Sequence, residues 1–172
     1  WACGPQLQLV DGYDNPISPG DPISGAISTL KAGKIVAIKG LGGFHLAVDA
    51  TNDKAVSQLR ESKGRDEKPF ALMAYDPERV GEFCLSSEDA LNELTSPERP
   101  IVLLPKHPEN NISSMVAPNN NYFGVMLPYT PIHYLLLRDN FIALVMTSGN
   151  LSREPLITDD QIALKKLGRI AA

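Results

Sequence analysis

The sequence has little of what would tie it to a metal, a disulfide framework or a membrane. Two cysteines among 172 residues, with no C-x-x-C pair, are too few for a disulfide framework and indicate reduced thiols in a cytoplasmic protein. The three histidines have no metal-ligand spacing, which argues against a zinc site. The longest apolar runs, such as 142–146, fall far short of the ~20 residues that a membrane-spanning helix needs. The sequence therefore predicts a cytoplasmic protein with no membrane segment.

A surplus of positive charge is also lacking. Lys and Arg total 16 and Asp and Glu total 20, for a net charge of −4, whereas a domain dedicated to duplex binding usually carries a basic surplus. The balance argues against nucleic acid as a partner and leaves room for a local basic pocket that binds phosphates. With 43% hydrophobic residues, the composition is typical of one soluble globular domain with a core of its own.

Apolar periodicity and turn residues predict alternating helices and strands after a Gly- and Pro-rich arm over residues 1–20. We expect helices over 21–33, 51–64, 77–84, 87–94, 131–138 and 159–167, the last one capped by Thr158. We expect strands over 34–39, 44–48, 69–75, 101–104, 122–126 and 141–146. Only about four residues join the first two strands, so they form either a hairpin or one bent strand. The pattern predicts an α/β fold with a mixed, twisted sheet, and one domain over 21–172 without an internal linker.

A glycine-rich segment, Gly40-Leu41-Gly42-Gly43, joins those two strands. It lacks the third glycine of a dinucleotide fingerprint and leads into a strand instead of a helix, so it fails as a Rossmann motif. Two interpretations remain. The segment is a tight turn that needs positive φ, or its backbone is kept bare so that a ligand can approach closely.

Charge is concentrated in the segment 60–69, at the expected end of a helix. It contains four cations and three anions, as a solvated helix end with intrahelical ion pairs would. In the alternative interpretation, Lys63, Arg65 and Lys68 converge on an anion, because Arg supplies a fork of donors to a phosphate and Lys a mobile point charge.

The segment Thr147-Ser148-Gly149-Asn150 directly follows an expected buried strand. Ligands of α/β sheets often bind where strands end, and short hydroxyl and amide side chains suit phosphate or ribose contacts. Ordinary turn chemistry explains the same residue types.

Taken together, these segments resemble one family. The residues that carry the resemblance are Gly-Gly-Phe-His-Leu at 42–46, Lys-Pro-Phe-Ala-Leu-Met at 68–73, Leu-Pro-Tyr-Thr-Pro-Ile-His at 127–133, Lys-Gly-Arg at 63–65 and Ser-Gly-Asn at 148–150. They resemble the YrdC-like domain, in the version found in HypF-type carbamoyltransferases of NiFe-hydrogenase maturation. The resemblance covers essentially the whole chain. It implies an open, twisted, mixed β-sheet with flanking helices around a concave nucleotide cleft.

The resemblance also implies a domain order: an acylphosphatase-like domain, zinc fingers that end in Cys-Gly-Pro, this domain, and a larger transfer domain. Residues 1–20 would then be the tail of the zinc-finger region, with Cys3 as a remnant zinc ligand. Residues 21–172 would be the nucleotide-binding domain of a longer polypeptide, and activity in the full reaction would need the other domains. The absence of an initial Met agrees with that expectation.

The implied reaction consumes ATP with Mg²⁺. A carbamoyl unit, taken from carbamoyl phosphate or bound as carbamate, would become carbamoyl-adenylate with release of pyrophosphate. The carbamoyl group would then pass to the C-terminal cysteine of HypE and later become a cyanide ligand of the hydrogenase iron.

The resemblance assigns roles to particular residues. Lys63, Arg65 and Lys68 match a Lys-x-Arg phosphate motif with its trailing Lys, and Ser148 and Asn150 match a Ser-x-Asn nucleotide motif. Lys63 and Arg65 would be catalytic by clamping the triphosphate.

The carbamoyl end of the ligand would lie by the glycine-rich segment. Lys39, Gly42, Gly43 and His45 are the candidate residues there, with His45 as a further catalytic candidate that donates to the carbamoyl oxygen. Alternation along a strand places His45 on the face of Gly43, and that face lines either the cleft or the core.

Two departures from the stand-alone threonylcarbamoyl-AMP synthases bear on substrate. Residues 126–128 stand where those enzymes carry an Arg-containing stretch, and residues 42–45 replace their Thr-x-Tyr-Gly-Leu pattern. The second change suggests a pocket for something smaller than threonine. The alternative functions are a threonylcarbamoyl-AMP synthase of tRNA modification, an RNA-binding module and an inactive scaffold.

Overall fold

A computed structural model describes residues 4, 6–17, 20–65, 67–150 and 154–171. Its strands form a six-stranded sheet in the order β1-β2-β6-β3-β5-β4. The strands are β1 Val36–Lys39, β2 Phe44–Asp49, β3 Ala71–Met73, β4 Val102–Pro105, β5 Tyr122–Met126 and β6 Leu144–Ser148. The helices are α1 Pro22–Lys31, α2 Asp53–Ser62, α3 Pro77–Gly81, α4 Glu88–Thr95, α5 Pro131–Leu137 and α6 Asp160–Leu167, with a 3-10 turn at Ser114–Val116.

The sheet is mixed, as the sequence predicts. β3 and β5 pair in parallel, and the other neighbouring pairs are antiparallel. The β1–β2 pair is a hairpin, which decides between the two alternatives left open above. Because β6 runs antiparallel to both β2 and β3, its last residues lie beside the first residues of those strands. The functional segments of the sequence meet at this end of the sheet.

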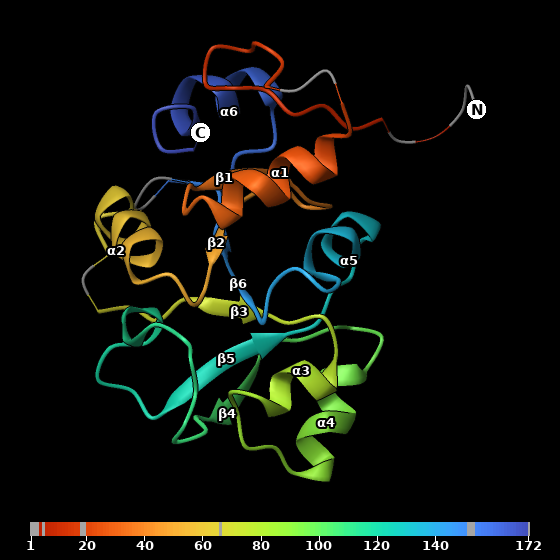
Figure 1. Ribbon diagram of the computed structural model, residues 1–172, viewed down its shortest axis with the longest axis vertical. Coiled ribbons are helices and arrows are strands. Elements are labelled where there is room, and N and C mark those ends of the chain that lie inside the picture. The colour runs from red at the N-terminus through yellow and green to blue at the C-terminus, as the bar shows by residue number, and fades with distance from the viewer. Residues whose placement is uncertain (1–3, 5, 18–19, 66, 151–153, 172) are drawn as a thin grey trace.

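Helices cover both faces of the sheet (Figure 1). On one face, Leu30 of α1 and Leu136 of α5 are buried against residues such as Ala47 and Met146. On the other face, Val56 and Leu59 of α2 are buried in a second core, whose other members include Leu46, Leu72, Val125 and Val145. Figure 1 shows α2 and α5 on opposite sides of β2 and β6. Because side chains alternate along a strand, successive residues of β6 face the α2 layer and the α5 layer in turn.

The ends of several elements differ from the sequence-based expectation. Asp159, not Thr158, caps α6 by accepting from the backbone N–H of Ile162. The strand expected over 141–146 is β6, and pairing with β2 extends it to Ser148, opposite His45. Thr147 and Ser148 are thus the last residues of a strand and do not follow it. The strand expected over 69–75 is the shorter β3, because only three of its residues have partners in the neighbouring strands.

The arm before α1 is docked on the domain over its described part. Leu9 packs against the core beneath α1 and α5, and Gly12 lies so close to Gly168 that neither position has space for a Cβ. A cavity of about 570 Å³ lies between this arm, α1, β1 and α6. Lys39 is the one predicted site residue that lines it, so this cavity is not the predicted nucleotide cleft. Cys3 lies outside the described residues. No helix in the described part of the chain is long and apolar enough to cross a membrane.

Candidate functional site

The end of α2 delivers Lys63 to the last turn of β6. Lys63 follows the helix as its C-cap, and the chain then turns at Gly64, where φ is +55°. The lysine is only 7% exposed. Its Nζ donates to the backbone oxygen of Ser148 and, at 3.0 and 3.2 Å, to the backbone oxygen and Oδ1 of Asn150. Residues about 85 positions apart in sequence are thereby joined.

The charge of Lys63 has no carboxylate partner among the residues that the structure describes. Burial, with a smaller contribution from the neighbouring cation Arg65, lowers the pKa of Lys63 to about 8. The ammonium group is still mostly protonated at pH 7, so the site holds a buried positive charge that is satisfied by neutral oxygens alone. Such a position favours the approach of an anion.

Arg65 adds a second cation beside Lys63. Its Nη1 donates to Thr147 Oγ1 at 3.0 Å, and its guanidinium lies 5.1 Å from the centre of the Phe70 ring. Burial and the charge of Arg60 lower the pKa of Arg65. The guanidinium has five N–H donors and Thr147 takes one of them, so a fork of donors is positioned at the end of β6.

Ser148 and Asn150 complete this group. Ser148 Oγ donates to Asn150 Oδ1 at 2.7 Å, and Asn150 Nδ2 donates to the backbone oxygen of Glu154 at 2.6 Å. We call the five residues Lys63, Arg65, Thr147, Ser148 and Asn150 the basic cluster. Four of them are residues that the sequence singled out for phosphate and nucleotide, and the fold brings those four together.

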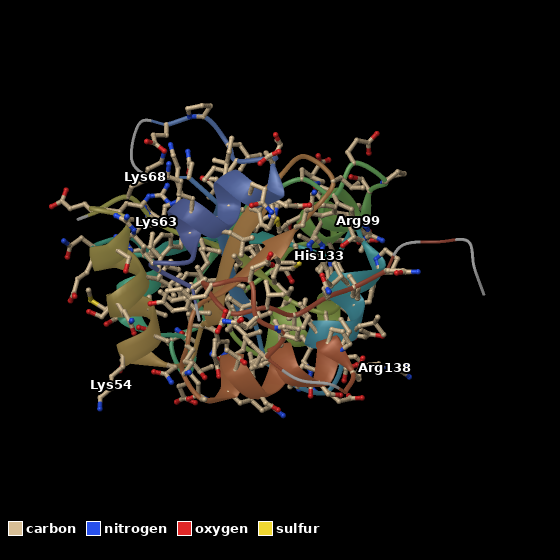
Figure 2. The ribbon with its side chains drawn as sticks, turned by 90° about the horizontal axis from the view of Figure 1, so that it is seen from above. Lys54, Lys63, Lys68, Arg99, His133 and Arg138 are labelled. Atoms are coloured by element: carbon tan, nitrogen blue, oxygen red, sulfur yellow. The ribbon has the colours of Figure 1, made fainter. Side chains whose placement is uncertain are left out.

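Lys68 joins the basic cluster less closely. Its side chain is exposed, and Figure 2 shows it on the same side of the molecule as Lys63, with Arg138 at the opposite margin. No hydrogen bond joins the Lys68 side chain to the described residues of the basic cluster, so its contact with phosphate stays a prediction.

Arg60 is a residue that the sequence-based reasoning missed. It is 5% exposed and lies 4.7 Å from the centre of the Phe70 ring. Its Nη1 donates to the backbone oxygens of Arg65 and Lys68 at 2.8 and 3.3 Å, and its Nε and Nη2 donate to that of Met115 at 3.1 and 2.6 Å. Arg60 thus holds the loop that carries the cations. The sequence signal for the burial of Arg60 is its position four residues after Val56, which places it on the buried stripe of α2.

The structure does not bring Lys39 together with His45 beside the glycine-rich turn. Cross-strand partners share a face of the sheet, and Lys39 pairs with Phe44 whereas His45 pairs with Ile38. Lys39 and His45 therefore lie on opposite faces. Lys39 instead forms a surface ion pair with Asp160 of α6, with 2.6 Å between Nζ and Oδ1.

Gly43 and Gly42 differ in the space that surrounds them. Gly43 has a φ of +141°, and a Cβ there would lie 2.6 Å from the backbone oxygen of Ile157 and within 3.0 Å of the Leu156 side chain. Gly43 thus has the positive φ that the tight-turn interpretation requires, and the chain itself fills the space where a Cβ would lie. At Gly42 a Cβ would meet nothing within 4 Å, so Gly42 remains open to a ligand.

His45 lies on the face of the sheet that α1 and α5 cover, as does its cross-strand partner Ile38. It is half-buried and faces His133 of α5, with 6.4 Å between ring centres. Its Nδ1 is buried without a hydrogen-bond partner, so it is not a satisfied core histidine. Its cross-strand neighbour on the other side is Ser148 of the basic cluster. His45 thus lies between the basic cluster and α5.

Comparisons with known proteins place the chain in one family. The sequence profile of the Sua5/YciO/YrdC family, described as telomere recombination, matches residues 28–172. Carbamoyltransferase HypF of Rhodobacter capsulatus is 48% identical over 169 residues, which are 98% of this chain and 22% of that protein. A full-length HypF, solved in a phosphate- and nucleotide-bound form, has a TM-score of 0.86 and 49% identity over 90% of this chain and 20% of its own.

A third relative is less similar in sequence. The threonylcarbamoyl-AMP synthase of Bacillus subtilis is 26% identical over 95% of this chain and 48% of its own length. The chain spans about a fifth of the length of the HypF proteins that it matches.

Proposed function

We propose, starting from the fact that this chain belongs to the Sua5/YciO/YrdC family, that its basic cluster binds the phosphates of ATP for a carbamoyl-activating reaction. One observation carries the proposal: a buried lysine and a half-buried arginine converge on one strand end, and the lysine has no carboxylate partner among the described residues. The 49% identity to a HypF solved with nucleotide and phosphate supports the choice of ligand.

The charges of the cluster suit a triphosphate. Lys63, whose three N–H groups donate to Ser148 and Asn150, supplies a fixed point charge. Arg65 supplies a planar fork, whose hydrogen bonds to phosphate are about twice as strong as those between neutral groups. Ser148 and Asn150 add a hydroxyl and an amide at the same strand end, suited to the α-phosphate or the ribose. Mg²⁺ enters with the nucleotide as part of the substrate and retains water ligands.

The chemical step is a displacement at the α-phosphorus. An oxygen of carbamate forms a bond to the α-phosphorus, the bond from that phosphorus to the β-phosphate oxygen breaks, and pyrophosphate leaves with the electron pair. Negative charge grows on the departing pyrophosphate, so positioning and fixed positive charge supply the catalysis. Lys63 and Arg65 carry out this role, and Lys68 adds charge at the rim.

Later steps belong to the rest of a HypF-type polypeptide. The carbamoyl unit originates from carbamoyl phosphate at the acylphosphatase-like domain. Carbamoyl-adenylate then passes to the transfer domain, where the thiolate of the C-terminal cysteine of HypE displaces AMP. Carbamoyl-adenylate hydrolyses readily, so a neighbouring domain must cover the site to exclude water.

The test measures ATP binding to this chain by calorimetry, together with pyrophosphate release from ATP by the full-length polypeptide. The variant Arg65→Ala is compared with Arg138→Ala, because the exposed Arg138 lies on the opposite side of the molecule (Figure 2). We expect Arg65→Ala to lose ATP binding and pyrophosphate release while Arg138→Ala retains both. Equal losses in both variants would contradict the proposal.

A threonylcarbamoyl-AMP synthase is the second candidate function. It shares the fold and the nucleotide chemistry, and it differs in the acceptor, which is L-threonine. Calorimetry with L-threonine in the presence of ATP and bicarbonate separates the two, since the carbamoyl-activating function predicts no threonine binding.

A further inference from the structure

Two histidines on the α5 face of the sheet have buried nitrogen atoms without partners. His133 is 1% exposed, and both of its ring nitrogens are buried without a hydrogen bond, as is Nδ1 of His45. The large majority of buried polar side-chain atoms in proteins are hydrogen-bonded. Three unpartnered nitrogens on two neighbouring rings therefore indicate a place built to hold a polar group.

The rings form a defined arrangement. The rings of His45 and His133 are 6.4 Å apart and nearly perpendicular, at 84°. The ring of Tyr129 lies 4.5 Å from that of His133, at 80°. A Cβ at Gly40 would come within 3.0 Å of Cε1 and Nδ1 of His45, so Gly40 provides the space that the His45 ring occupies. We call His45, Tyr129 and His133 the histidine cluster.

Both histidines of the cluster are neutral at physiological pH. Burial lowers the pKa of His45, and burial together with the charge of His45 lowers the pKa of His133 to about 4. A neutral imidazole has one N–H donor and one nitrogen that accepts. The cluster therefore offers two acceptors, which neither Lys63 nor Arg65 can supply.

The histidine cluster adjoins the basic cluster. His45 and Ser148 are direct cross-strand partners and so point to the same face of the sheet. Ser148 is exposed and is hydrogen-bonded to Asn150. A ligand whose phosphates lie at the basic cluster thus has its next group beside His45.

We infer that His45 and His133 bind the amino group of an unsubstituted carbamoyl unit and so make the site selective for it. The inference rests on the proposed function, because the carbamoyl unit must be joined to a nucleotide held at the basic cluster. One amino nitrogen that donates two hydrogen bonds of ~2.9 Å bridges two acceptor atoms about 5 Å apart. Each acceptor lies about 1 Å from its ring centre, so an amino nitrogen off the line between the rings would lie about 4 Å from both ring centres, which rings 6.4 Å apart allow.

The number of N–H or O–H groups on the ligand then decides which ligands are accepted. Carbamate carries two N–H groups and satisfies both rings. N-methylcarbamate carries one N–H and a methyl group, bicarbonate carries one O–H, and threonine carbamate is both bulky and limited to one N–H. Each of these leaves one buried acceptor unpaired, which a site built on hydrogen bonds penalises heavily.

The test uses the full-length polypeptide and measures pyrophosphate release from ATP with two probes. Carbamate is supplied by ammonium with bicarbonate, and N-methylcarbamate by methylamine with bicarbonate. We expect the unchanged protein to prefer carbamate by about 10²-fold or more in kcat/KM. His133→Phe and His45→Phe should bring this ratio near one and raise KM for carbamate, while KM for ATP stays unchanged. His133→Gln, which retains an acceptor, should keep part of the preference.

His107→Phe serves as the control, because His107 lies in the loop after β4 and its Nδ1 accepts from the backbone N–H of Glu109. A merely structural role for the two histidines would lower the melting temperature and reduce both rates alike, leaving the ratio unchanged. That result overturns the inference, and the half-buried His45→Phe decides the matter if His133→Phe fails to fold. Failure of the unchanged protein to release pyrophosphate with carbamate would instead overturn the proposed function, and this inference with it.

Discussion

Replacing Lys63 with methionine should separate function from stability in this domain. The substitution keeps the length of the side chain and removes its charge, while the surrounding core stays filled. We expect ATP binding to be lost and the free energy of unfolding at pH 7 to stay within about 1 kcal/mol of that of the unchanged chain.

The small expected change in the free energy of unfolding follows from two opposing contributions. The pKa of Lys63 falls from 10.5 to about 8 through burial, which means that keeping it charged in the folded state costs about 3 kcal/mol. The substitution removes that cost, but it leaves the backbone oxygens of Ser148 and Asn150 without the donor that Nζ supplies, at about 1–3 kcal/mol each and with poor additivity. The two effects have opposite signs and similar sizes.

The pH dependence gives the sharper test. A lysine whose pKa is lowered by folding binds fewer protons in the folded state than in the unfolded state between about pH 8 and 10.5, so its contribution to stability rises with pH over that range. Urea unfolding of both chains between pH 7 and 10.5 should show the unchanged chain gaining up to about 3 kcal/mol relative to Lys63→Met. The other titrating groups cancel in this difference. A constant difference across the range would refute the reasoning.

Arg60→Met is the matched comparison for this experiment. Arg60 is as deeply buried as Lys63, and its donors hold the backbone oxygens of three residues, Met115, Arg65 and Lys68. Removing them leaves carbonyl groups unpaired at a cost of about 1–3 kcal/mol each. We expect Arg60→Met to lose about 3 kcal/mol or more of stability, which is more than Lys63→Met loses, because it leaves more backbone oxygens without a donor.

Three further predictions follow from the same contacts. Arg65→Ala should weaken ATP binding by ~10- to 150-fold in calorimetry, and should lower stability by about 1 kcal/mol because the Phe70 and Thr147 contacts are lost. Arg138→Ala should change neither quantity. Equal ATP affinities of the two variants would remove the phosphate role from Arg65. Gly43→Val should destabilise the fold by about 2 kcal/mol or more, because the new Cβ would collide with the backbone of Ile157. Gly42→Ala should fold normally. Equal melting temperatures of these two variants would contradict the prediction. ATP affinity should hold steady up to about pH 8 and fall above it, since a bound anion favours protonated Lys63; a flat profile from pH 7 to 10 would show that Lys63 does not contact phosphate.

Local sequence signals predicted most of the fold. The Asp21-Pro22 pair begins α1, and Asn52 and Ser87 cap α2 and α4 by accepting from backbone N–H groups. These are interactions within a few residues of the chain, so the sequence locates the start of each helix to within about one residue, as with Asp159 beside the expected Thr158. The ends of β6 and β3 depend instead on how far neighbouring strands extend, and no local pattern carries that information.

The same distinction between local and long-range interactions explains which candidate site residues the sequence could identify. Lys63, Arg65, Ser148 and Asn150 form a motif by residue type, and the fold brings them together. Lys39 was grouped with His45 because both adjoin the glycines, but the register of the hairpin puts them on opposite faces. Arg60 was read as part of a solvated helix end because charge alone suggests exposure, and its backbone acceptors come from segments up to 56 residues away.

The segment Ser-Gly-Asn joins the two halves of the proposed site. The cations reach the end of β6 from α2, which covers one face of the sheet, whereas His45 and His133 lie on the α5 face. A ligand that contacts both halves must cross the end of the sheet where β6 stops. Gly149 lies at that crossing, and a Cβ there would come within 2.6 Å of the backbone oxygen of Phe44. The backbone N–H of Gly149 donates to that same oxygen, so the turn is drawn tightly against the first residue of β2. The middle position of the Ser-x-Asn motif must therefore be glycine in this chain, because any side chain there would push the Ser148–Asn150 pair away from His45 and separate the phosphate half of the site from the carbamoyl half.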